Sequence, residues 1–159
     1  MEIIDNFLDR KDVEFVFEYC FTSSYNYGET DNERTPPTGM VHSIESDEII
    51  YNLFESKIRD SYDMVKGMKL CRMYINCFAP SENPYFHTDG NDLTFLYYVN
   101  DRTWEINDGG ETQFLIDDEI KGVIPLPNRI VGFDSKLLHR ATSFRDHHRF
   151  TIALKFSSI

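Results

Sequence analysis

The chain lacks the features of membrane-spanning and disulfide-stabilised proteins. Its 159 residues contain no apolar run near the roughly 18 residues that a transmembrane helix needs. Only three cysteines occur, Cys20, Cys71 and Cys77, without metal-like spacing and each within an apolar segment, so we expect reduced core residues. The N-terminal "MEIIDNFLDRKD" lacks the basic-then-apolar order of a signal peptide. We therefore expect no membrane association and a location in the cytoplasm of the producing or infected cell.

Positive charge and nucleophile motifs are also scarce. Sixteen Lys and Arg face 27 Asp and Glu, which gives a net charge of −11 and argues against nucleic acid as a partner. A basic peptide would suit this charge, although an acidic surface commonly serves solubility alone. There is no G-x-S-x-G motif and no phosphate-binding glycine loop, so the common hydrolase and nucleotide-binding classes are disfavoured.

The first 66 residues are predicted to form a helical support for the rest of the chain. Asp9 can cap a helix over residues 10–21, where apolar residues recur at i, i+3, i+4 and i+7. A second helix is expected to begin at Ser46, with acidic residues in its first turn. The polar, proline-containing stretch between them is predicted to be loop. Residues 28–40 of this loop are either a lid or an ordinary surface loop.

After Lys66 the pattern changes to short runs rich in β-branched and aromatic residues, separated by turn-forming clusters. These predicted strands are "MKLCRMYINCF", "LTFLYYVN", "ETQFLI", "NRIVGFDS" and "RFTIALKF". Helices followed by many closely spaced strands favour a mainly β fold, a sandwich or jelly roll with helices packed on it. We expect one domain over residues 1–159, with its β core at about 67–159.

The last predicted strand has two distinct faces. Its apolar face comprises Phe150, Ile152, Leu154 and Phe156, and its other face Arg149, Thr151, Ala153 and Lys155. If the second face is buried, Arg149 needs an anionic partner, because an isolated buried charge is costly. The alternative is that Arg149 lies at a solvated strand end.

The segment "NPYFHTDG" places two metal-binding side chains at i and i+2. In an extended chain His87 and Asp89 point the same way. Two histidines and one carboxylate form the usual open face for Fe(II), and His139, which follows a predicted strand, can supply the second imidazole. The remaining histidines are less suited to this role: His42 is predicted to be a satisfied core residue, and His147 and His148 are predicted to be solvated turn residues.

The chain resembles the Fe(II)- and 2-oxoglutarate-dependent dioxygenases in one pattern, which consists of His-x-Asp, a later His and an Arg ten residues beyond that His. The chain looks most like their prolyl-hydroxylase branch, which includes small phage and bacterial members. The resemblance extends from about Leu70 to Phe156. It is carried by "YFHTDG", by the tyrosine-bearing "LTFLYYVN", by "NDGGETQF" and by "IPLPNRIVGFDSKLLHRATSFRDHHRFTIALKF".

This resemblance implies a double-stranded β-helix and a set of site residues. His87, Asp89 and His139 would hold iron, and Arg149 would bind the remote carboxylate of 2-oxoglutarate. The other implied residues are Tyr98, which would join Arg149, and Tyr74, which would reach the cosubstrate near the metal. Lys155 departs from the family pattern, because some relatives have an aromatic residue there, so the resemblance does not define the substrate pocket.

The implied reaction uses Fe(II), 2-oxoglutarate and O2, with ascorbate as an optional reductant. It hydroxylates a C–H bond, in this branch a proline of a peptide or protein, and releases succinate and CO2. A free amino acid is the alternative substrate. A non-catalytic, cupin-like metal- or sugar-binding module is less favoured, because both the HxD motif and Arg149 are present. Substrate identity, stereochemistry and oligomeric state stay open.

Overall fold

The computed structural model describes residues 1–159 and contains two antiparallel β-sheets and two α-helices. The larger sheet has the strand order β1-β8-β5-β10-β4-β3-β2, and the smaller sheet has the order β7-β6-β9. The strands are β1 (Glu2–Ile4), β2 (Asn26–Tyr27), β3 (Met40–Ser43), β4 (Met68–Phe78), β5 (Leu93–Val99), β6 (Thr112–Ile116), β7 (Glu119–Val123), β8 (Ile130–Asp134), β9 (His139–Ala141) and β10 (Arg149–Ser158). The helices are α1 (Arg10–Thr22) and α2 (Ile49–Ser61), followed by a short 3-10 helix (Asp63–Val65).

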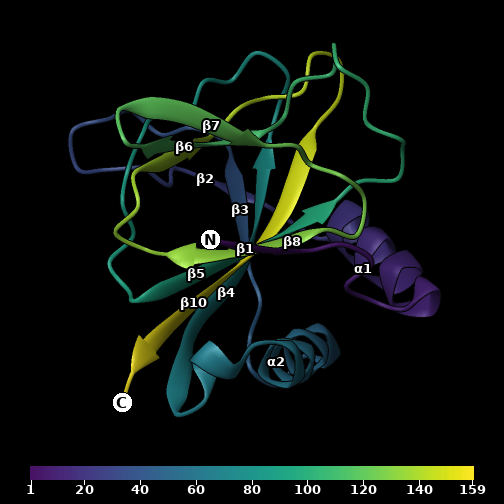
Figure 1. Cartoon of the computed structure of the whole chain (residues 1–159). Helices are drawn as coiled ribbons and strands as arrows, with labels where there is room; N and C mark the ends of the chain where they lie inside the picture. The colour runs from purple at the N-terminus through teal and green to yellow at the C-terminus, as the bar shows by residue number, and fades with distance from the viewer.

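The larger sheet lies between the two helices and the smaller sheet (Figure 1). It separates two apolar cores. On one face, α1 and α2 pack against strand residues that include Ile152 and Phe156 of β10. On the other face, residues such as Ala153 pack with Phe114 of β6 in the smaller sheet. The alternation of side chains along β10 thus directs its apolar face to the helices and its polar face to the space between the sheets. This arrangement confirms the mainly β, double-stranded β-helix (jelly-roll) prediction.

The first helix runs over 10–22, within one residue of its predicted end, whereas the second begins three residues later than predicted. Glu48 is its N-cap residue and not part of its first turn. The Glu48 carboxylate accepts hydrogen bonds from the Glu45 N–H at 2.7 Å and from the Tyr19 hydroxyl. These contacts hold Ser46 and its neighbours in a turn before the helix.

The five predicted strands correspond to β4, β5, β6, β8 and β10, and the shorter strands were not predicted. The prediction of three buried cysteines is correct for Cys20 and Cys77 but wrong for Cys71, which is exposed. The register explains the difference, because Lys155 of β10 pairs with Arg72 and Phe156 pairs with Leu70. Cys71 is therefore the extra residue of a β-bulge, a feature that is frequent beside active sites.

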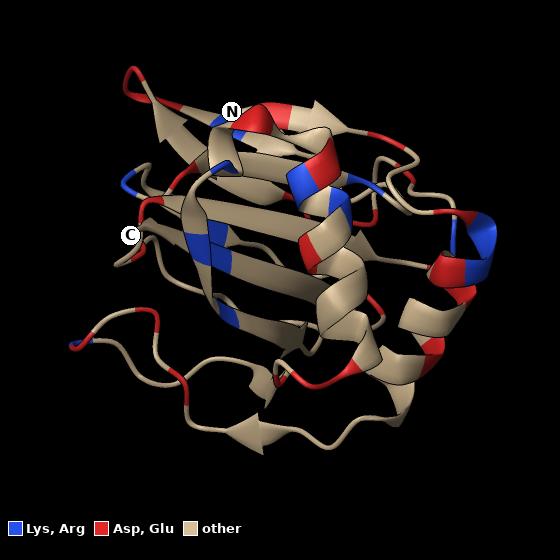
Figure 2. Cartoon of the chain, turned by 90° about the horizontal axis from the view of Figure 1, so that it is seen from below, with Lys and Arg blue, Asp and Glu red and all other residues tan.

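The helices are short, with 13 residues each, and no helix of this chain is both long and apolar enough to cross a bilayer. Acidic residues are spread over the helices and the connecting loops, and the long strands of the larger sheet carry few charges (Figure 2).

Candidate active site

A cavity of about 450 Å³ lies between the inner face of the larger sheet and the smaller sheet. Its walls come from β3, β4, β5, β6, β9 and β10 and from two loops. One loop is the 28–40 segment, which contributes Glu29, Asp31 and Thr38, and the other contains the HxD motif. Most of the lining side chains are polar, which is unusual for a space between two packed sheets and indicates a binding site.

The backbone brings the HxD segment beside the start of β9. The His87 N–H donates to the His139 carbonyl at 2.9 Å, and the His139 N–H donates back to the His87 carbonyl at 3.0 Å. The Asp89 N–H donates to the Ser135 carbonyl at 2.8 Å. As a result, one ligand atom from each of His87, Asp89 and His139 lies within 4.8 Å of the other two. The i, i+2 spacing does place both HxD side chains on the same side.

Both imidazoles are oriented by hydrogen bonds on their outer nitrogens. Nδ1 of His87 donates to the Tyr85 carbonyl at 3.0 Å, and Nδ1 of His139 donates to the Leu137 carbonyl at 2.8 Å. These bonds assign the proton to Nδ1 and leave the Nε2 lone pair of each ring free for a metal ion. Burial, together with the nearby His87, lowers the pKa of His139 to about 4, so its ring is neutral at pH 7 as a metal ligand must be.

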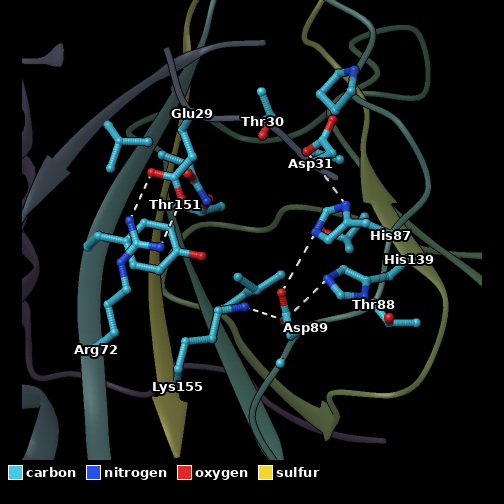
Figure 3. Close-up of a pocket in the computed structure, with 18 of the residues that line it drawn as sticks. Glu29, Thr30, Asp31, Arg72, His87, Thr88, Asp89, His139, Thr151 and Lys155 are labelled. Carbon is cyan, nitrogen blue, oxygen red and sulfur yellow. Dashed lines mark hydrogen bonds and ion pairs between the residues drawn. The ribbon is translucent and has the colours of Figure 1, made fainter. Parts of the chain in front are cut away.

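Asp89 completes the group as an ionised carboxylate. Burial alone would raise the pKa of Asp89, but the charge of Lys155, the nearby His139 and the hydrogen bond from Thr94 outweigh that effect and lower it. Nε2 of His87 lies 3.8 Å from Oδ1 of Asp89, and Nε2 of His139 lies 3.6 Å from Oδ2 (Figure 3). Two imidazoles and one carboxylate form a donor set that fits Fe(II).

Arg149 lies in the same cavity at the beginning of β10 and is only 2% exposed, so the alternative of a solvated strand end is wrong. Its guanidinium donates to the Gly110 carbonyl at 2.7 Å and to Oγ1 of Thr112 at 2.9 Å. It has no carboxylate within ion-pair distance, and burial lowers its pKa. A buried cation whose partners are all neutral oxygens fits an anionic ligand.

Of the two tyrosines named from the sequence, Tyr74 lines the cavity, whereas Tyr98 lies behind its lining and contacts Arg149 and Thr112. The Tyr98 ring lies 5.6 Å from the guanidinium carbon of Arg149, and its hydroxyl donates to Oγ1 of Thr112 at 2.7 Å. Tyr74 is buried on β4 and lines the cavity near Lys155, whose Nζ lies 5.9 Å from the ring centroid. Tyr98 therefore accompanies Arg149, and Tyr74 lies nearer the His-Asp-His group.

The 28–40 loop is attached to the cavity by two acidic side chains. The Glu29 carboxylate accepts two hydrogen bonds from Arg72, at 2.9 and 2.8 Å, and the Arg72 guanidinium stacks over the Tyr74 ring at 4.0 Å. Oδ2 of Asp31 accepts from the Tyr85 N–H at 2.7 Å, while Oδ1 lies 3.6 Å from Nδ1 of His87. Figure 3 shows Asp31 beside His87 and Glu29 beside Arg72 on the opposite side of the cavity.

The other histidines lie outside the metal-ligand group. His42 has both ring nitrogens hydrogen bonded, to Tyr19 at 3.1 Å and to Ser24 at 2.8 Å, so it is satisfied as predicted, although it is partly exposed. His148 is exposed, in line with the prediction. For His147 the prediction of a solvated turn residue is wrong, because its ring stacks on Phe144 with a centroid distance of 4.1 Å.

Sequence reasoning assigned no role to several polar residues that contact these groups. Thr112 bonds both Arg149 and Tyr98, and Thr94 and Lys155 bond Asp89. The alternation of β10 did place Lys155 and Thr151 on the same face as Arg149, which was the one available signal. The partners of these residues come from strands that are distant in sequence.

The depressed pKa of His139 gives a testable dependence of stability on pH. In the unfolded chain the imidazole takes up a proton near its ordinary pKa of 6.5, whereas the folded, metal-free protein does so only near 4. Between these values the unfolded chain binds more protons, so metal-free stability should fall as pH decreases from about 6.5 to 4. Urea unfolding at several pH values would measure this slope. His139→Asn should flatten it and His148→Asn should not; equal slopes in all three proteins would contradict the assignment.

Comparisons with known proteins bear on the same residues. Residues 73–156 match the family described as the 2OG-Fe(II) oxygenase superfamily, and this match includes the HxD segment, β9 and Arg149. No curated protein sequence matches the chain.

Several solved structures share the fold. A prolyl-4-hydroxylase of Pseudomonas putida superposes with a TM-score of 0.79 at 15% identity, covering 99% of this chain and 92% of that one. A prolyl hydroxylase from Trichoplax adhaerens, solved with a peptide fragment of the hypoxia inducible factor oxygen degradation domain, has a TM-score of 0.75 at 17% identity, covering 99% and 83%. A viral collagen prolyl hydroxylase from Paramecium bursaria Chlorella virus-1, solved with 2-oxoglutarate, has a TM-score of 0.72 at 15% identity, covering 99% and 96%.

Proposed function

Because the chain belongs to the 2OG-Fe(II) oxygenase superfamily, we propose that it hydroxylates a prolyl residue of a peptide or protein and releases succinate and CO2. It is a 2-oxoglutarate-dependent dioxygenase, and its cofactors are Fe(II), 2-oxoglutarate and O2. The observation that carries the proposal is one cavity that contains both the His87, Asp89 and His139 group and the buried Arg149, which has no ion-pair partner.

His87, Asp89 and His139 would hold the iron in this cavity. When bound, Fe(II) supplies the activation of O2 that couples decarboxylation of 2-oxoglutarate to hydroxylation of a C–H bond. Imidazoles that bind a metal are neutral, so among the three ligands only Asp89 would bring negative charge, which leaves a net positive charge on a divalent ion. That charge favours an anionic chelating cosubstrate beside the histidines.

Arg149 would bind the remote carboxylate of the cosubstrate. Thr112 supports this role, because its Oγ1 accepts from both Arg149 and the Tyr98 hydroxyl and thus keeps its own O–H available to donate. A guanidinium and a hydroxyl that both donate into a buried space satisfy an anion there. Tyr74, nearer the iron ligands, would contact the other end of 2-oxoglutarate.

The prolyl substrate is supported by the proteins that share the fold over almost the whole chain. The structures named above are called prolyl hydroxylases, and one of them was solved with a peptide fragment. Proline suits such a site, because its fixed φ lowers the entropy cost of ordering an extended segment. The net charge of −11 would favour a substrate with basic residues near the proline.

A free amino acid is a second candidate substrate, and one observation favours it. Arg72 and Lys155 both line the cavity near Asp89, and Lys155 stands where some relatives have an aromatic residue. Two cations beside the iron ligands would suit the carboxylate of a small molecule, although each is paired in this structure, with Glu29 and with Asp89 respectively.

A peptide assay separates the two candidates. Protein, Fe(II), 2-oxoglutarate and ascorbate are incubated with a pool of proline-containing peptides or with free L-proline. We expect a peptide mass gain of one oxygen atom, which fragmentation would locate on proline, and faster turnover of peptides that also carry Lys or Arg. That preference should weaken with salt, because exposed charges are screened within about 10 Å at ~0.1 M.

The same protein with Asp89→Ala is the matched control and should modify nothing. Hydroxylation of free proline with no peptide modified would overturn the peptide proposal and leave the assignment of iron and 2-oxoglutarate intact.

A further inference from the structure

Lys155 is a buried cation beside a proposed iron ligand. It lies on the inner face of β10, opposite Arg72 of β4 and Thr94 of β5, and only 8% of the residue is exposed. Its Nζ donates to Oδ2 of Asp89 (Figure 3) and lies 3.2 Å from Oγ1 of Thr94. A lysine is rarely buried without a specific partner, and here that partner is the carboxylate of the His-Asp-His group.

The two oxygens of Asp89 have different surroundings. Oδ2 accepts hydrogen bonds from Oγ1 of Thr94, at 2.5 Å, and from Lys155. The Thr94 hydroxyl is itself fixed, because Oγ1 lies 2.8 Å from Oγ of Ser135, which accepts from the Asn91 side chain at 2.7 Å. Both oxygens lie near a histidine, Oδ2 at 3.6 Å from Nε2 of His139 and Oδ1 at 3.8 Å from Nε2 of His87, but Oδ1 accepts no hydrogen bond from the protein. Two donors occupy the two lone-pair directions of Oδ2, so Oδ1 is the oxygen that stays available.

We propose that Lys155 is a positioning residue for Asp89: its hydrogen bond engages Oδ2, so that Oδ1 is the oxygen offered to the iron, and its charge limits the affinity of the site for divalent ions. This inference rests on the proposed function only in that His87, Asp89 and His139 hold the metal. A carboxylate that offers one oxygen leaves more coordination positions for a chelating cosubstrate and O2 than a carboxylate that offers two. Hydrogen-bond partners of this kind commonly orient metal ligands.

The sign of the effect on metal affinity follows from the buried pair. In the metal-free protein Lys155 is the only Lys or Arg in contact with Asp89. Its removal leaves a buried carboxylate without a counter-ion, which is destabilising, and a divalent ion then supplies the missing positive charge. In the wild type the ion instead binds next to an existing ammonium and is repelled by it. Loss of Lys155 should therefore destabilise the metal-free protein more than the metal-bound protein, which by linkage strengthens metal binding.

The test is titration of the metal-stripped full chain with Co(II) alone, without 2-oxoglutarate, in wild type and in Lys155→Met. We expect Kd for Co(II) to fall by about tenfold in Lys155→Met, and Co(II) to raise Tm more in the variant than in the wild type. The visible spectrum of the bound Co(II) should also change, because Asp89 becomes free to use both oxygens.

Arg72→Met is the matched control. Arg72 is the neighbouring cation opposite Lys155, and it pairs with Glu29 and makes no contact with Asp89. Its removal should therefore change Kd for Co(II) by less than about twofold. An equal gain in affinity in both variants would show a general effect of cavity charge and overturn the positioning role.

An unchanged or higher Kd in Lys155→Met would overturn the inference, and an unchanged Co(II) spectrum would overturn the orienting part of it. If Lys155→Met does not fold, Lys155→Gln, which keeps an N–H donor but loses the charge, must bind Co(II) more tightly than wild type. Failure of the proposed function is a separate result: Asp89→Ala would then bind Co(II) as well as the wild type does.

Discussion

Replacement of His87, Asp89 or His139 by alanine is expected to reduce 2-oxoglutarate-dependent succinate formation by at least about three orders of magnitude. Each change removes one of three ligand atoms that lie within 4.8 Å of one another. A divalent ion held by the remaining two side chains would be weakly bound and wrongly placed relative to the cosubstrate. Succinate release with saturating Fe(II) and 2-oxoglutarate measures the loss, and circular dichroism verifies that each variant is folded.

The other histidines supply the controls for this experiment. His148→Ala should keep nearly full activity because the side chain is exposed, and His147→Ala should do so because its ring contacts Phe144 outside the cavity. His42→Ala loses hydrogen bonds to Tyr19 and Ser24 and should lower stability more than turnover. Full activity of His139→Ala together with loss of activity in His42→Ala would mean that the third ligand is misassigned.

The proposed iron ligands were predictable because two of them are local in sequence. The side chains of His87 and Asp89 share a face through strand geometry alone, and the structure places His139 beside them by pairing its backbone with that of His87. The alternation of β10 placed Arg149 on the face opposite to Ile152 and Leu154, which pack in an apolar core, but it left open whether the Arg149 face is buried. Period-2 patterns carry this information without any knowledge of distant contacts.

The contacts around Asp89 were not predictable in the same way. The pairing of Lys155 with Asp89 depends on which residues of β4 and β5 lie opposite Lys155. Lys155 is the last residue of β10 before the register with β4 shifts at the Cys71 bulge, and the pairing of strands that are distant in sequence leaves no clear mark in an apolar run. The later start of α2 has a related cause, since the carboxylate of Glu48 bonds the distant Tyr19 and no local pattern reveals that contact.

Loss of the Arg149 side chain is expected to separate metal binding from cosubstrate binding. Arg149→Ala should bind Co(II) as the wild type does, because Arg149 makes no contact with His87, Asp89 or His139. Its apparent affinity for 2-oxoglutarate should weaken by about one to two orders of magnitude. Hydrogen bonds to charged groups contribute roughly 1.5–3 kcal/mol, and about 1.4 kcal/mol corresponds to a tenfold change.

Three further variants decide whether that loss comes from a charge-assisted contact. Arg149→Lys keeps a cation but not the planar fork, so it should recover only part of the affinity. Tyr98→Phe removes the hydroxyl that donates to Thr112, and its effect should be smaller and in the same direction. Arg129→Ala removes an arginine that pairs with Asp5 outside the cavity and should leave the apparent affinity for 2-oxoglutarate unchanged. An unchanged apparent affinity for 2-oxoglutarate in Arg149→Ala would mean that Arg149 does not bind the cosubstrate. The buried guanidinium, whose only partners are neutral oxygens, would then serve the fold alone.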